Sequence, residues 1–194
     1  MKVTALIPAR LSSTRFDRKL LMDLCGKSII LRTYESVVET GLFHSVYVVT
    51  EDQEIYKEIV NAGGNSILSK NKHESGSDRI AEACESIDSD AFVNIQGDEP
   101  FIDSSSLKKL VFELNNSDHV SLMINISDIN EINDPNNVKV IVDSENYALY
   151  FSRSVIPFCR DVNTAEVTYY KHIGVYGFAK QALVNFSKLP PSKL

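Results

Sequence analysis

The segment Ala91-Phe92-Val93-Asn94-Ile95-Gln96-Gly97-Asp98-Glu99-Pro100 joins an apolar run to a polar turn. Residues 91–94 have the length and composition of a strand buried on both faces of a sheet. A carboxylate, Asp98, follows closely where this predicted strand ends. In an open parallel α/β sheet, ligands bind outside the carboxyl ends of the strands. The segment therefore predicts a buried strand with an acidic group at the ligand-binding edge.

A second short strand is predicted at Val3–Ile7, and it opens into a basic loop that holds Arg10, Arg15 and Lys19. Fixed positive charge stabilises the transferring phosphate and its leaving group, and an Arg guanidinium binds phosphate oxygens bidentately. Mg²⁺ is usually held by one or two carboxylates together with substrate phosphates. One basic and one acidic strand end thus predict a phosphate-bearing ligand and a divalent metal, with Asp98 as the metal ligand. The alternatives are a solvated basic loop and an acid at a helix N-terminus, which suits Glu99.

Two further groups of residues have a functional and a structural interpretation. Residues 74–79 precede a predicted helix, and their backbone N–H groups suit a base edge or an anion, or else a simple capping loop. Arg153, His172 and Tyr176 lie on or next to predicted strands, where His172 and Tyr176 share one face. These three side chains suit an acidic sugar, whereas a single His on a strand is also an ordinary structural residue.

Strand and helix patterns alternate through the first two-thirds of the chain. Strands are predicted at 3–7, 45–50, 65–68, 91–94 and 120–126, and helices at 28–39, 53–61, 77–85 and 104–114. This order predicts an α/β fold with a mostly parallel sheet and helices on both faces. After residue 130, strands at 138–142, 148–151 and 172–178 and a helix from 180 to 186 predict an antiparallel insert. We expect a single domain, with a nucleotide-binding core at 1–118 and an insert at 119–178.

Composition narrows the function. The 194 residues carry a net charge of −6, which argues against a general nucleic-acid binder. Residues 1–32 hold seven Lys or Arg and two Asp, a net of +5, so the remainder carries −11. A basic pole in an acidic protein suits a small polyanion. Three scattered cysteines and the lack of a membrane-length apolar run or signal peptide predict a reduced, cytoplasmic protein that does not bind a membrane.

Read in order along the chain, several strings of residues resemble one family, 3-deoxy-manno-octulosonate (Kdo) cytidylyltransferase, or CMP-Kdo synthetase. The resemblance spans essentially all of the sequence. The strings are Ile7-Pro8-Ala9-Arg10, Ser13-Thr14-Arg15-Phe16, Lys19, His73-Glu74-Ser75-Gly76-Ser77-Asp78-Arg79, Asn94–Pro100, Asn136-Asn137-Val138-Lys139-Val140, Tyr147–Arg153 and His172-Ile173-Gly174-Val175-Tyr176.

The resemblance implies a Rossmann-like, three-layer nucleotidyltransferase fold of the nucleotide-diphospho-sugar transferase type. It implies the Mg²⁺-dependent reaction of CTP with Kdo to give CMP-Kdo and diphosphate, a step of lipopolysaccharide biosynthesis, and a homodimer built largely by the insert. By resemblance, the triphosphate is bound by Arg10, Arg15 and Lys19, the nucleotide is seated by Ser75, Gly76 and Arg79, the metal is bound by Asp98, and Kdo is held by Gln96, Arg153, His172 and Tyr176. Arg10, Lys19 and Asp98 carry the catalytic roles.

The sequence departs from the family pattern in two places. Asp17-Arg18 stands where the family has Pro-Gly before the loop lysine. The family domain also continues beyond the position of Leu194, into a sugar-binding helix and a Gly-x-Asp-Thr motif with the second metal-binding Asp. Two alternatives therefore stay open beside the Kdo enzyme. One is a non-catalytic or split homologue that only binds CTP, and the other is a cytidylyltransferase for a related acidic sugar, such as sialic acid or 8-amino-Kdo. The Kdo-like strings at 147–153 and 172–176 argue against sialic acid.

Overall fold

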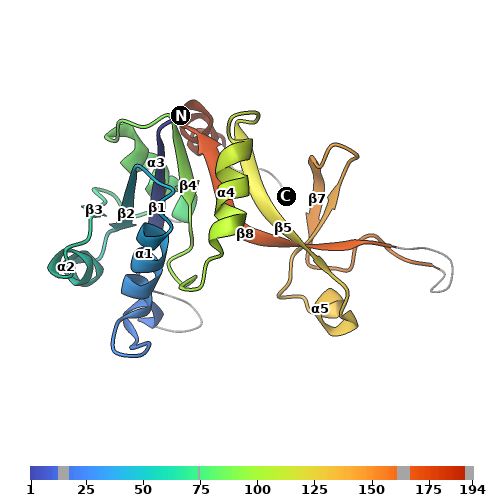
Figure 1. The fold of residues 1–194 in the computed structure, drawn as a ribbon, viewed down its shortest axis with the longest axis horizontal. Helices are drawn as coiled ribbons and strands as arrows, with labels where there is room; N and C mark the ends of the chain where they lie inside the picture. The colour runs from blue at the N-terminus through green and yellow to red at the C-terminus, as the bar shows by residue number, and fades with distance from the viewer. Residues whose placement is uncertain (13–17, 74, 161–166, 191–194) are drawn as a thin grey trace. The chain divides into compact units, whose positions relative to one another are not determined.

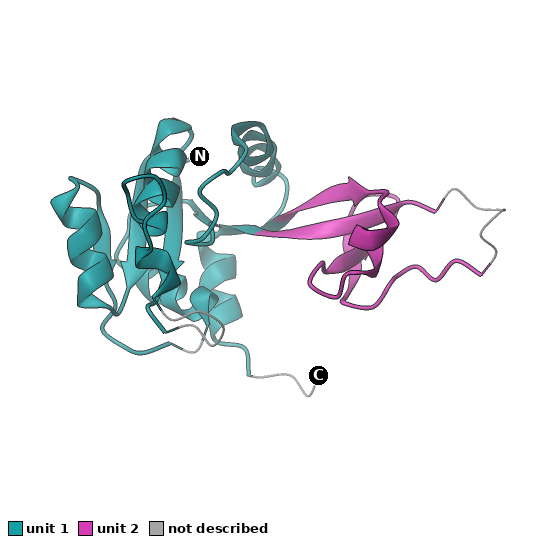
Figure 2. Cartoon of the chain, turned by 90° about the horizontal axis from the view of Figure 1, so that it is seen from below, with its two compact units in different colours: residues 1–120, 175–194 teal, residues 121–174 magenta. Residues whose placement is uncertain are grey.

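A computed structural model of the chain describes residues 1–12, 18–73, 75–160 and 167–190 (Figure 1). The described chain forms two compact units (Figure 2). The first unit holds residues 1–120 and 175–194, and the second holds residues 121–174. Two long strands, β5 (His119–Ile126) and β8 (Tyr169–Ala179), run through the boundary between the units.

The first unit is built on parallel strands whose side chains are buried. Its strands are β1 (Val3–Ala9), β2 (Ser45–Thr50), β3 (Ser66–Leu68) and β4 (Ala91–Asn94), with the end of β8 added antiparallel, in the order β3-β2-β1-β4-β8. Thr4 pairs with Ser45 and with Phe92 in the parallel register. Every residue of β1 and β4 is buried, as expected for strands covered on both faces.

Helices cover both faces of this sheet. The helical elements of the unit are η1 (Lys19–Leu21), α1 (Ile29–Glu39), α2 (Gln53–Asn61), α3 (Gly76–Glu85), α4 (Ser104–Glu113) and α6 (Lys180–Ser187). On one face, Ile80 of α3 and Leu183 of α6 pack with Leu6 and Phe92. On the other face α4 lies against β8, so closely that a Cβ on Gly177 would lie 2.8 Å from Leu110. The predicted three-layer α/β fold with a mostly parallel sheet is thus confirmed.

The second unit is antiparallel. It contains α5 (Ile129–Asn133), β6 (Lys139–Val142) and β7 (Ala148–Ser152), together with parts of β5 and β8. Strands β6 and β7 form a hairpin in which Lys139 pairs with Ser152, and β6 also pairs with β8 through Lys139 and Lys171. Asp143 closes the hairpin turn by accepting from the backbone N–H groups of Glu145 and Tyr147.

Most predicted elements match the observed ones to within two residues, and the differences have local causes. Ser28 caps α1 as its sequence position suggests, by accepting from the Leu31 N–H. Asp52 also stands at a helix start, but its carboxylate makes no capping bond to α2 and instead accepts from the Leu11 N–H at 2.7 Å. The short elements η1 and α5 were not predicted, because single turns carry no clear periodicity.

Two further findings concern membrane-spanning helices and the state of the cysteines. In the part of the chain that the structure describes, no helix is long and apolar enough to cross a membrane. Cys25, Cys84 and Cys159 are free thiols, and burial raises the pKa of Cys84.

Candidate active site

The basic loop leaves the end of β1 and is tied down by an acid that follows β2. Arg10 is exposed directly after the buried strand, and Leu11 is held by Asp52. The predicted triphosphate ligand Arg15 lies outside the described residues. Lys19 begins η1, and its exposed side chain returns toward the sheet. The loop therefore starts and ends at the carboxyl edge of the sheet.

Arg18 occupies the position where the family has glycine, and its backbone explains that preference. Its φ of 57° lies in the left-handed region, which glycine adopts without steric cost. The Arg18 guanidinium forms a two-pronged ion pair with Glu54 of α2. Its charge is therefore already matched by a carboxylate of the protein.

Lys19 and Asp98, which lie 79 residues apart in the sequence, are in direct contact. Lys19 Nζ donates to Asp98 Oδ2 at 2.6 Å, and both side chains remain over 40% exposed. The ammonium thus stands where a cation would bind the carboxylate. Because the pair is open to solvent, its net contribution to stability is small and a stronger cation can replace it.

The turn that carries Asp98 is held in place by contacts with α1 and β1. Thr33 of α1 is buried and donates to the Gly97 carbonyl at 2.9 Å. A Cβ on Gly97 would lie 3.0 Å from Ile30 and 3.3 Å from the Pro8 carbonyl, so this close approach requires glycine. The helix that follows, α4, is capped by Asp103. Asp98 and Glu99 therefore belong to the turn after β4 and not to a helix N-terminus.

The predicted nucleotide-seating residues gather at the start of α3. Ser75 caps the helix by accepting from the Asp78 N–H, and a Cβ on Gly76 would lie 3.2 Å from Pro8 of β1. Arg79 is buried and bonds to both carboxylate oxygens of Glu51, at 2.6 and 2.9 Å. Arg79 therefore locks α3 to the residue after β2, and its contact with a nucleotide stays a prediction.

The first unit also holds two of the predicted sugar-binding residues. Gln96 is half-buried in the turn after β4, where its carbonyl accepts from the Glu99 N–H. Tyr176 lies on β8 opposite Asn94 and stacks on Phe178 with ring centres 6.3 Å apart. Burial raises the pKa of the Tyr176 hydroxyl.

The other two predicted sugar-binding residues lie in the second unit. Arg153 follows β7, is exposed, and donates to the Pro135 carbonyl at 2.8 Å. His172 of β8 is half-buried, with Nε2 2.8 Å from the Ser121 hydroxyl and its ring edge-on to Phe151. Burial lowers the pKa of His172, so the ring is neutral near pH 7. This arrangement suits a hydrogen-bonding role and also satisfies a structural one.

Three acids between the end of β2 and the first turn of α2 were not predicted as site residues. Glu51 holds α3 through Arg79, Asp52 holds the loop after β1, and Glu54 holds Arg18. Their sequence position could have indicated a role, because Glu51 and Asp52 directly follow β2, which is the neighbour of β1 in the sheet. They hold the loop after β1 and the start of α3 in place through hydrogen bonds and ion pairs.

The residues present also fit a Mg²⁺ ion. Within the described ranges, no three His, Cys, Asp or Glu side chains cluster as a preformed metal cage. Asp98, however, presents an accessible carboxylate that already holds a cation, Lys19. Mg²⁺ suits one carboxylate completed by waters and substrate phosphates.

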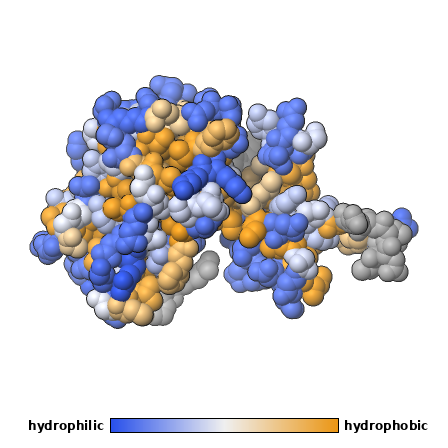
Figure 3. Space-filling view, viewed as in Figure 1, coloured by the Kyte–Doolittle hydropathy of each residue, from blue (hydrophilic) through white to orange (hydrophobic). Residues whose placement is uncertain are grey.

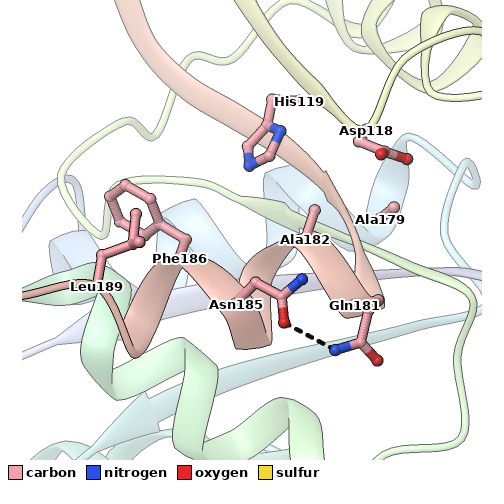
Figure 4. Close-up of a pocket in the computed structure, with 8 residues that line it drawn as sticks. All are labelled: Asp118, His119, Ala179, Gln181, Ala182, Asn185, Phe186 and Leu189. Atoms are coloured by element: carbon pink, nitrogen blue, oxygen red, sulfur yellow. Dashed lines mark hydrogen bonds between the residues drawn. The ribbon is translucent and has the colours of Figure 1, made fainter.

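A pocket of about 270 Å³ lies elsewhere in the first unit, between the start of β5 and α6 (Figure 4). Ala182, Phe186 and Leu189 supply apolar walls, and Gln181 donates to Asn185 along the helix. None of the predicted site residues lines this pocket.

Comparison with known proteins identifies the family of the chain. A family model described as Cytidylyltransferase matches residues 4–194. The 3-deoxy-manno-octulosonate cytidylyltransferase of Christiangramia forsetii is 54% identical over 97% of the chain and 78% of its own length. That of Flavobacterium johnsoniae is 53% identical over all of the chain and 81% of its own length. The chain belongs to the 3-deoxy-manno-octulosonate cytidylyltransferase family. It spans about four-fifths of the length of these relatives.

Solved structures place this cytidylyltransferase fold in a wider group. A CMP:2-keto-3-deoxy-manno-octonic acid synthetase complexed with CTP matches all of the chain and 80% of its own, with a TM-score of 0.92 and 36% identity. A 4-diphosphocytidyl-2C-methyl-D-erythritol synthase from Anaerococcus prevotii has a TM-score of 0.63 at 14% identity, over 99% of this chain and 80% of its own. This second likeness concerns the fold alone.

Proposed function

We propose that this chain is a cytidylyltransferase that activates Kdo, with CTP and Kdo as substrates and CMP-Kdo and diphosphate as products. Identity above 50% across nearly the whole chain to relatives that carry this activity in their names supports the proposal most directly. A chain so similar throughout shares the arrangement of strand ends on which the site is built.

The triphosphate binds at the edge formed by the ends of β1 and β4. Arg10 and Lys19 supply the positive charge there, with Arg15 as a further ligand. On CTP binding, Lys19 exchanges Asp98 for phosphate oxygens, since an exposed ion pair holds the lysine only weakly. Ser75 and Gly76 present the start of α3 to the nucleotide, and Glu51 keeps that helix in place through Arg79.

Asp98 holds Mg²⁺ in this proposal, together with the substrate phosphates. When bound, the ion supplies positive charge that neutralises the phosphate oxygens near the attacking hydroxyl. Thr33 and Gly97 fix the turn on which the Asp98 carboxylate stands, so the ligand is positioned before the metal arrives.

The Kdo ligands in this proposal, Gln96, Arg153, His172 and Tyr176, are those that the family resemblance implies. The Arg153 guanidinium pairs with the sugar carboxylate, because a planar fork matches two carboxylate oxygens. His172, Gln96 and Tyr176 bond to sugar hydroxyl groups. A neutral imidazole and amide suit hydroxyl groups because each both donates and accepts.

The reaction is an in-line displacement at the α-phosphorus of CTP. The anomeric oxygen of Kdo forms a bond to that phosphorus, and the bond from phosphorus to the bridging oxygen of the β-phosphate breaks. Diphosphate leaves with the electron pair, and the hydroxyl proton passes to water. Arg10 and Lys19 stabilise the charge on the phosphate oxygens, so positioning and electrostatics supply most of the rate.

The enzyme works as a cytoplasmic homodimer in lipopolysaccharide biosynthesis. Apolar side chains reach the surface of both units (Figure 3). Leu149, Tyr150 and Phe151 of the edge strand β7 are 64, 63 and 46% exposed, and such a run of exposed apolar side chains on an edge strand is typical of a protein–protein contact. Light scattering tests the dimer: Leu149→Glu is expected to give a monomer, while Phe101→Glu, on the exposed Phe101 of the first unit, keeps the mass of a dimer. A wild-type monomer would contradict this part.

Diphosphate release tests the activity. The 194-residue chain is incubated with CTP and Mg²⁺, and with Kdo, 8-amino-Kdo, sialic acid or no sugar. Release that depends on Kdo supports the proposal. Faster release with 8-amino-Kdo than with Kdo would identify 8-amino-Kdo as the substrate instead. A folded protein that binds CTP but releases no diphosphate with any sugar would contradict catalysis by this chain.

A further inference from the structure

Lys139, at the start of β6, is fully buried although lysine is rarely found inside a protein. Its ammonium donates to the backbone carbonyls of Asp134 and Asn137, at 3.0 and 2.7 Å. These residues begin and end a tight turn, which the Asn137 N–H closes by donating to the Asp134 carbonyl at 3.1 Å. The lysine therefore clamps both ends of one turn from the protein interior.

The outer side of the same turn holds Arg153. The Arg153 guanidinium donates to the carbonyl of Pro135, the residue between the two clamped carbonyls, at 2.8 Å. The hairpin register explains the proximity, since Lys139 pairs with Ser152, the residue before Arg153. One turn thus separates a buried ammonium from an exposed guanidinium.

We infer that Lys139 is a positioning residue for substrate binding: by clamping the 134–137 turn it fixes the Pro135 carbonyl, which orients Arg153 toward the sugar carboxylate. This inference rests on the proposed function, in which Arg153 binds Kdo. Movement of the turn would leave the buried Lys139 ammonium without its carbonyl partners. Because an unpartnered buried charge is energetically costly, the turn stays rigid. Among the described residues Arg153 forms no ion pair with a carboxylate, and one neutral carbonyl orients it while leaving its charge uncompensated.

The test is a double-mutant cycle between Lys139 and Arg153, read out as the KM for Kdo and, separately, for CTP. Lys139→Met keeps the length of the side chain and removes the clamp. It is expected to raise the KM for Kdo about tenfold through coupling to Arg153, with the KM for CTP unchanged. In an Arg153→Ala background the same change is expected to have no further effect on Kdo use.

The matched control is Lys171→Met. Lys171 of β8 is the pairing partner of Lys139 on β6, so the control removes the same charge from the neighbouring strand and leaves the turn unchanged. It is expected to leave both KM values unchanged. Equal losses for Kdo and CTP in Lys139→Met, or a full Lys139 effect that persists without Arg153, would overturn the inference.

A second variant keeps the test decisive if Lys139→Met does not fold. Asp134→Ala removes the carboxylate that accepts from the Asn136 backbone and side chain, at 2.8 and 2.9 Å, and leaves the buried lysine in place. It is expected to raise the KM for Kdo about threefold, an effect that disappears in the Arg153→Ala background. An unchanged KM would overturn the inference. Should Arg153→Ala itself leave Kdo use intact, the proposed sugar site fails, and the inference fails with it.

Discussion

The two units hold their polar side chains in different ways. In the first unit, three cations are paired with carboxylates of the protein: Lys19 with Asp98, Arg79 with Glu51 and Arg18 with Glu54. In the second unit, Arg153 is held by a backbone carbonyl and the neutral His172 by a hydroxyl group. The neutral carbonyl orients Arg153 without cancelling its charge.

This difference predicts different costs of binding. In the proposed site, a triphosphate and its metal replace the Lys19–Asp98 contact, so their net affinity is the gain from the new ion pairs minus the loss of this one. The proposed sugar carboxylate would form the first ion pair of Arg153 among the described residues, so no existing ion pair is lost there. Within the first unit, the exposed pair exchanges readily, whereas the buried Arg79–Glu51 pair is a fixed part of the fold.

The largest expected effect is on Asp98. Asp98→Asn keeps the shape but replaces the charged metal ligand with a neutral amide, so Mg²⁺-dependent turnover should fall by roughly 100- to 1,000-fold. Diphosphate release at saturating CTP and Kdo measures it. Glu99→Gln removes the adjacent exposed acid and should retain most activity. Undiminished turnover in Asp98→Asn would show that the metal does not bind at this turn.

The buried pair of the first unit should matter most for stability. Glu51→Gln leaves the Arg79 guanidinium buried without a carboxylate, which is expected to cost about 3 kcal/mol of unfolding free energy. Thermal and urea unfolding measure the loss. Glu54→Gln breaks the exposed pair with Arg18 and should change the melting temperature little. Equal losses in the two variants would abolish the distinction between fixed and exchangeable pairs.

A substitution of Arg153 tests the second unit, where a neutral group holds the cation. Arg153→Ala removes a charge-assisted contact to the sugar, so the KM for Kdo should rise roughly 10- to 100-fold while the Kd for CTP stays constant. Arg160→Ala, a change at another exposed arginine of the second unit, serves as the control. A parallel loss of CTP binding would show that Arg153 serves no separate sugar site.

The smallest effect concerns pH. Burial lowers the pKa of His172 in the folded protein, whereas in the unfolded chain it titrates near 6.5. As pH falls through that value the unfolded chain binds the proton first, so the native state loses stability. The melting temperature should therefore fall less between pH 7.5 and about 5.5 in His172→Gln than in the wild type. The three other histidines are present in both proteins, and identical pH profiles would contradict the burial of a neutral ring.

The fold was predictable from the sequence because its elements carry strong local signals. Continuous apolar runs at 45–50 and 91–94 predicted the buried strands at their observed bounds. The helical patterns likewise predicted α1 and α2 to within one residue of their observed bounds. Alternation of these elements then allowed few topologies other than a parallel sheet.

The candidate residues were found from the sequence, but their partners were not. Chain order alone placed Asp98 and the loop that holds Lys19 after the ends of two parallel strands, and parallel strands bring their carboxyl ends to one edge. Only the tertiary structure paired those two side chains, tied Arg79 to Glu51 and Asp52 to the Leu11 N–H, and buried Lys139 beneath the turn that holds Arg153. The geometry of these contacts is set only when the helices and strands pack together. The residue pattern along one segment therefore does not indicate which residue of another segment it will contact.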